Sequence, residues 1–139
     1  MYDAVLVPTD GSPGAEAAVD HGIHMAAQNG ATVHAVHVVD VTDFGDIAEG
    51  DEDLVAQGYE VVEPVVAKAE EAGLEVVETV LEGTPHERLL EYAGRKEIDA
   101  IAIGTHGKSG LSRVLLGSTA EEIVREAPVP VLTVREALE

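Results

Sequence analysis

Five short apolar runs alternate along this chain with segments of helical spacing, and this alternation limits the fold more than any other feature. The apolar runs lie at residues 4–7, 32–39, 75–81, 99–103 and 131–134. Strands that alternate with helices form parallel sheets joined by right-handed crossovers. We therefore expect one α/β domain over residues 1–139, a doubly wound five-stranded parallel sheet with helices on both faces.

Capping residues and prolines place the helices between these strands. The expected helices cover residues 13–28, 54–72, 85–96 and 118–127. Ser12-Pro13 predicts the first start, and the capping box Thr84-Pro85-His86-Glu87 predicts the third. Gly58 and Pro64 interrupt the helical spacing of the second segment, which predicts a kink or a late start.

The charge of the chain excludes several classes of function. Its 27 acidic residues oppose eight basic ones, for a net charge of −19. Such a surface repels nucleic acid and acidic lipid, so we expect neither nucleic acid nor a membrane as a partner. The acidity suggests a halophile, because a salt-rich cytoplasm screens the repulsion. A chain without cysteine or a signal-peptide pattern is also expected in the cytoplasm.

The segment 104–118 has the composition of a phosphate-binding loop. Its pattern is Gly104-x2-Gly107-x9-Gly117-Ser118, it follows an apolar strand, and it leads into a helix start. Lys108 and Arg113 also lie in it. The spacing matches neither a Walker A loop nor a dinucleotide fingerprint. If the first and fourth strands are neighbours, Asp10 and this loop share one crevice at the carboxyl ends of the strands.

Together these segments resemble the ATP-binding subgroup of the universal stress protein family. The resemblance spans essentially the whole chain, from AVLVPTDGS at 4–12 through VHVVD at 36–40 to VPVLTV at 129–134. It implies an adenine-nucleotide α-hydrolase-like fold with strand order 3-2-1-4-5. It also implies ATP as the ligand, together with Mg²⁺.

The resemblance implies a role for each residue that matches the family pattern. Pro8, Thr9 and Asp10 would meet the nucleoside, with Asp10 near the ribose and any metal on the phosphates. Val38 would contact the adenine. The residues expected around the ribose and phosphates are Gly104, Thr105, His106, Gly107, Lys108, Ser109, Gly110 and Arg113. Those expected to close on the terminal phosphates are Gly117, Ser118 and Thr119.

Structural roles remain open for some of these residues. Ser118 and Glu121 form a capping box, so the Ser118 hydroxyl can cap the helix with or without a bond to phosphate. Asp10 can turn the chain after the first strand instead of holding Mg²⁺. His106 is either a phosphate or ribose contact or a solvent-exposed loop residue.

The other histidines give little sign of a metal site. His34 and His37 are an odd number of residues apart on a strand, so they point to opposite faces and cannot chelate one ion together. His21 and His24 share a helix face, but the sequence offers no third ligand near them.

The sequence thus predicts a homodimer that binds ATP and serves as a nucleotide-dependent stress sensor or adaptor. No activated nucleophile or acid–base pair stands out, so we expect no efficient enzyme, although slow ATP hydrolysis at Asp10 stays open. The short apolar edge Val129 to Val134 is expected to pair with its symmetry mate. The alternative is an adaptor that acts through unidentified protein partners without nucleotide. A flavodoxin-like carrier is disfavoured, because the chain has no Trp and one Phe.

Overall fold

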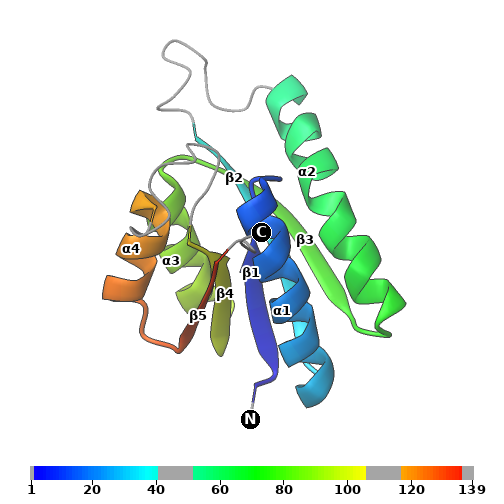
Figure 1. Ribbon diagram of the computed structural model, residues 1–139. Coiled ribbons are helices and arrows are strands. Elements are labelled where there is room, and N and C mark those ends of the chain that lie inside the picture. The colour runs from blue at the N-terminus through cyan, green and yellow to red at the C-terminus, as the bar shows by residue number, and fades with distance from the viewer. Residues whose placement is uncertain (1, 41–51, 106–116, 136–139) are drawn as a thin grey trace.

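A computed structural model describes residues 2–40, 52–105 and 117–135 (Figure 1). Strands and helices alternate along the chain as expected. The strands are β1 (Ala4–Pro8), β2 (Thr32–Val39), β3 (Val76–Glu82), β4 (Ala100–Gly104) and β5 (Val131–Val134). The helices are α1 (Pro13–Asn29), α2 (Glu52–Glu71), α3 (Pro85–Arg95) and α4 (Ser118–Glu126).

The sheet is entirely parallel and has the order β3-β2-β1-β4-β5, which confirms the predicted fold class. β1 lies at its centre, where Leu6 is opposite His34 of β2 on one side and Ile101 of β4 on the other. The crossovers run in opposite directions on the two sides of β1. The carboxyl ends of β1 and β4 therefore meet at a topological switch point, where open α/β sheets bind ligands.

Each face of the sheet has its own core. Val5, Val7 and Val33 pack with apolar residues of α1 and α2, whereas Leu6 and Ile101 pack with those of α3 and α4. Figure 1 shows the two helix pairs on opposite sides of the sheet. Alternate residues of a strand point to opposite faces, so strands buried on both faces are almost continuously apolar.

The first helix begins and ends as the sequence predicts. The Ser12 hydroxyl accepts a hydrogen bond from the Ala15 N–H at 3.3 Å, and Pro13 follows the cap. Gly30 ends the helix in the left-handed region, with φ of 64°, a conformation that glycine adopts without steric cost.

The second helix does not start late, one of the two outcomes predicted from Gly58 and Pro64. α2 begins at Glu52 and continues through both Gly58 and Pro64. A Cβ atom on Gly58 would lie 2.7 Å from a methyl carbon of Val80 on β3, so this glycine lets the helix approach the sheet closely. Pro64 lies on the exposed side of the helix. Tertiary packing therefore outweighs the weak helix propensity of these two residues.

Neither predicted capping box forms. Thr84 is the N-cap of α3 by its backbone, but its side chain makes no capping hydrogen bond. In α4 the N-cap is Gly117, so Ser118 is already the first helical residue. The Glu121 carboxylate pairs with Arg125 at 3.0 Å, one turn further along. Pro85 lacks an N–H, which reduces the number of donors that a cap of α3 has to satisfy.

Within the described part of the chain, every helix is too short or too polar to cross a membrane.

Candidate functional site

A crevice opens at the carboxyl edge of the sheet, where β1, β2 and β4 end. Its walls come from these three strands, from the turn after β1 and from the N-terminal parts of α1, α3 and α4. The lining residues are Pro8, Thr9, Asp10, Ala15, Val36, His37, Val38, Pro85, Leu89, Ile103, Gly104 and Thr119. The sequence predicted six of them: Pro8, Thr9, Asp10, Val38, Gly104 and Thr119. Residues far apart in the chain thus form one site at the switch point.

The turn after β1 is held by a chain of hydrogen bonds. The Thr9 N–H donates to the Val36 carbonyl at 2.9 Å, and the Gly11 N–H donates to the Thr9 hydroxyl at 3.0 Å. The Ser12 N–H donates to Oδ1 of Asp10 at 2.9 Å. Gly11 has a φ of 80°, which favours glycine. Asp10 therefore turns the chain, the structural role left open by the sequence, and it also lines the crevice.

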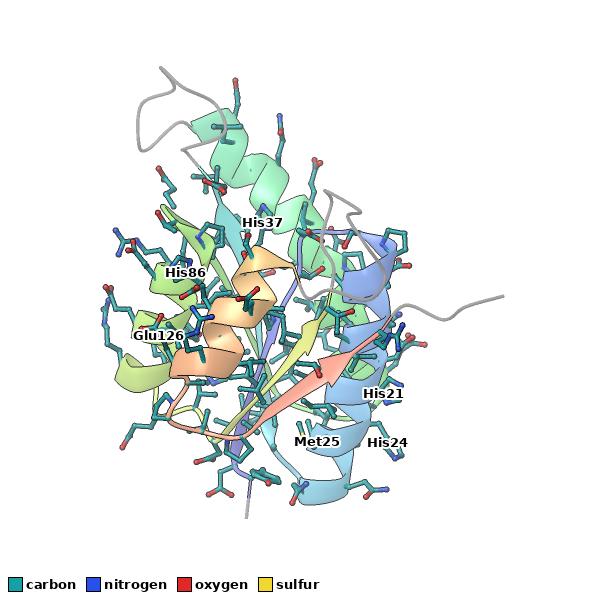
Figure 2. The ribbon with its side chains drawn as sticks, turned by 60° about the vertical axis from the view of Figure 1, so that its left-hand side comes forward. His21, His24, Met25, His37, His86 and Glu126 are labelled. Carbon is teal, nitrogen blue, oxygen red and sulfur yellow. The ribbon has the colours of Figure 1, made fainter. Side chains whose placement is uncertain are left out.

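His37 secures the same turn from β2 (Figure 2). Its Nδ1 lies 2.8 Å from the Thr9 carbonyl oxygen. Because a carbonyl oxygen only accepts, Nδ1 must carry the proton. The ring carbon Cδ2 would lie 3.3 Å from a Cβ atom on Gly58, so α2 packs against the other side of this imidazole. No role at the site was predicted for His37 from the sequence, and its position directly before Val38 was the available signal.

The second strand histidine is separate from the site. His34 is buried on the α3 face, where its Nδ1 lies 2.7 Å from the Tyr92 hydroxyl. This confirms that His34 and His37 belong to opposite faces. Burial, assisted by the positive charge of Lys96, lowers the pKa of His34. Burial also raises the pKa of Tyr92. A neutral imidazole paired with a neutral phenol is a stable core pair.

The crevice has an apolar wall suited to a flat ring. Val36, Leu89 and Ile103 are buried side chains, and Val38 and Pro85 are partly exposed beside them. Ligand pockets are typically lined by such residues, with a few polar groups that fix orientation. Here the polar groups include Thr9 and Asp10, in the turn after β1. Val36 is two residues before Val38 and so shares its strand face, a signal the sequence analysis did not use.

Packing against α1 requires glycine at position 104, which was not predicted from the sequence. A Cβ atom at this position would lie 2.6 Å from the carbonyl oxygen of Gly14, in the first turn of α1. Real Cβ atoms essentially never approach that closely. The absence of a side chain therefore lets β4 pack against the start of α1. Gly104 also borders the crevice.

The start of α4 forms the remaining border. The Gly117 N–H donates to the Thr105 carbonyl, and Thr105 is itself buried, with its N–H bonded to Val134 at 3.0 Å. Ser118 is exposed, and Thr119 lines the crevice. The first N–H groups of a helix and its positive dipole end favour an anion at such a position. The other predicted contacts, His106, Gly107, Lys108, Ser109, Gly110 and Arg113, lie outside the described residues.

Comparisons with known proteins agree over nearly the whole chain. The sequence profile of the universal stress protein family matches residues 1–135. Universal stress protein MJ0531 of Methanocaldococcus jannaschii is 40% identical over 142 residues, covering 98% of this chain and 84% of that protein. The solved structure of MJ0577 from the same organism has a TM-score of 0.87 at 30% identity, covering 100% of this chain and 99% of that chain.

Among the solved relatives is one described with a ligand. It is a universal stress protein in complex with cAMP, with a TM-score of 0.76 at 26% identity, and the match covers 98% of each chain. Sequence and fold thus point the same way, and neither similarity depends on the glycine loop alone. The chain belongs to the universal stress protein family.

Proposed function

We propose that the crevice binds an adenine nucleotide, ATP, and that the protein is a nucleotide-dependent sensor or adaptor of the stress response. The observation that carries the proposal is the lining of the crevice: apolar side chains and the polar turn of Thr9 and Asp10 border the same crevice at the switch point of the sheet. A purine base needs apolar side chains to lie against, and a ribose needs polar groups to hydrogen-bond. The family relative in complex with cAMP supports the same ligand class.

In this proposal the adenine, the ribose and the phosphates each contact a different part of the crevice. The adenine lies against Val38 and the buried apolar residues beside it, and the ribose lies near Thr9 and Asp10. The phosphates extend toward the first turn of α4 and the glycine-rich segment 104–118. Asp10, Thr119 and the backbone of Gly117 and Ser118 then surround the charged end.

We further propose that Mg²⁺ accompanies the phosphates. A chain of net charge −19 repels ATP at long range, so binding has to depend on local donors and on a cation. Asp10 is our candidate for its protein ligand, in addition to its hydrogen bond to Ser12. We assign no catalytic residue. Slow hydrolysis would require Asp10 and the ion to orient a water molecule.

The proposed assembly is a homodimer through the C-terminal strand. β5 lies at one end of the strand order and is only four residues long. Its Leu132 is 40% exposed, which is high for a large apolar residue in a strand. An isologous pair of such edges extends the sheet and covers the apolar side chains.

Mass spectrometry of the small molecules released from the purified, heat-denatured protein tests the ligand class. We expect an adenine nucleotide, and ATP in particular. A protein that releases no nucleotide and also fails to bind added ATP would favour the alternative, an adaptor that acts through protein partners with an empty crevice.

A further inference from the structure

Three potential metal ligands meet between α3 and α4, outside the lining of the crevice. His86 lies in the first turn of α3, and Glu122 and Glu126 lie one turn apart on α4. One ligand atom from each residue lies within 4.8 Å of the other two. Figure 2 shows His86 and Glu126 on these adjacent helices. His86 and Glu122 are partly buried, and Glu126 is exposed.

We propose that His86, Glu122 and Glu126 bind a divalent transition-metal ion, for which Zn²⁺ is the best match. One imidazole nitrogen and two carboxylate oxygens are ligands that Zn²⁺ accepts, and three protein ligands leave its fourth position to water. Mg²⁺ and Ca²⁺ prefer oxygen alone, so the histidine argues against them.

The spacing requires only a small closure around the ion. Ligand atoms around tetrahedral Zn²⁺ are roughly 3.4 Å apart, given metal–ligand distances of about 2.0–2.2 Å. Starting from separations of up to 4.8 Å, side-chain rotation can supply the difference. The exposed carboxylate of Glu126 is the one with most room to move.

Electrostatics favour a cation at this position. Glu122 and Glu126 are like charges at positions i and i+4, an arrangement that destabilises a helix. The net charge of −19 also attracts cations in general. A bound ion would remove the repulsion and connect α4 to α3.

Arg125 competes for one of the ligands. It pairs with Glu122 at 2.9 Å and with Glu121 at 3.0 Å. Exposed ion pairs of this kind contribute little to stability. When Glu122 turns to the metal, Arg125 keeps its bond to Glu121, so the competition is weak.

The site is separate from the proposed nucleotide site but close to it in the fold. Pro85 and Thr119 line the crevice, and His86 and Glu122 follow them on the same two helices. The metal ligands themselves do not line the crevice. The proposal therefore stands whether or not the protein binds ATP.

Calorimetric titration with Zn²⁺ alone, without nucleotide, tests the site. We expect one Zn²⁺ per chain in the wild type, and at least about a tenfold loss of affinity in both His86→Ala and Glu126→Gln. His24→Ala is the matched control, because His24 is an exposed helical histidine whose partner in the structure is Gln28. Its affinity for Zn²⁺ should equal that of the wild type. Far-UV circular dichroism checks that each variant folds.

Thermal unfolding gives a second, independent measurement of Zn²⁺ binding. Zn²⁺ should raise the melting temperature of the wild type and of His24→Ala, and should raise that of the two ligand variants much less. Wild-type affinity for Zn²⁺ in His86→Ala, or an equal loss in His24→Ala, would overturn the proposal. So would a wild-type protein that does not bind Zn²⁺.

Discussion

Gly104 is the residue whose role is most sharply defined by packing. Replacing it with alanine places a Cβ atom 2.6 Å from the Gly14 carbonyl oxygen, and backbone has to move to relieve the contact. We expect Gly104→Ala to lower the free energy of unfolding by about 1–3 kcal/mol, the usual cost of overpacking.

Gly94→Ala is the matched control for this prediction, measured by urea denaturation. Gly94 lies within α3, and an added Cβ atom there meets no heavy atom within 4 Å beyond its chain neighbours and the backbone of its own helix. Alanine should stabilise this helix by roughly 0.5–1 kcal/mol. If both variants show the same change, the close approach of β4 to α1 does not explain Gly104.

Asp10 combines a demonstrated structural role with a proposed metal role, and Asp10→Asn separates them. Asparagine keeps an oxygen that can accept from the Ser12 N–H, so the turn should survive. We expect wild-type ATP affinity to fall substantially when a chelator removes Mg²⁺. The Asp10→Asn protein should show a smaller dependence on Mg²⁺. Equal dependence in calorimetric titrations of both proteins would remove Asp10 from the metal site.

His34 makes stability depend on pH in a known direction. Its pKa is lowered in the folded state, so the unfolded chain binds more protons as the pH falls below about 6.5. The contribution of His34 to stability is therefore complete above that pH and is lost as the pH falls toward the lowered value.

Unfolding by urea at several pH values below 7 measures this contribution. The free energy of unfolding should fall less steeply on acidification in His34→Gln than in the wild type. His21→Gln is the control for the loss of a histidine, because His21 is exposed on α1. A His34→Gln slope equal to that of the wild type would contradict the account.

At the scale of elements, the sequence predicted both ends of each of the nine described strands and helices to within about two residues, because apolar runs, prolines and Ser12 are local signals. The prediction failed at Gly58, where contacts with a residue distant in the sequence determine the helix. Gly58 is a poor helix former that α2 tolerates because Val80 lies against it. The same limit applies to the site. Its apolar wall includes Leu89 and Ile103, which read as ordinary core residues until the fold brings them to the crevice.

The edge strand β5 carries the proposed dimer, and Leu132→Glu tests it. In a symmetric dimer the new carboxylate would lie near the same carboxylate of the other copy, and the two would repel each other. The variant should therefore be a monomer, whereas we expect the wild type to be a dimer. Analytical ultracentrifugation measures both. Val77→Glu is the matched control, because Val77 is 41% exposed on β3 at the opposite edge of the sheet. A Leu132→Glu protein that remains dimeric would exclude β5 as the interface.

At the scale of the whole molecule, the feature with the largest expected effect on stability is the net charge. The net charge of −19 on 139 residues should destabilise the folded state through self-repulsion. The Debye length falls from about 30 Å at 0.01 M salt to about 3 Å at 1 M. The melting temperature should therefore rise steeply with KCl over this range. A melting temperature that does not change with salt would show that the acidic surface is not an adaptation of protein stability to high salt.

The most direct test of the central proposal is ATP affinity in the wild type and in Gly117→Val. Gly117 has φ of −65° and ψ of 156°, a conformation that valine adopts readily, so the fold should survive. The added side chain would stand at the proposed phosphate end of the crevice. We predict that calorimetric titration with ATP and Mg²⁺ shows binding to the wild type and none to Gly117→Val, with unchanged far-UV circular dichroism. Equal ATP affinity in the two proteins would contradict the phosphate site at the start of α4.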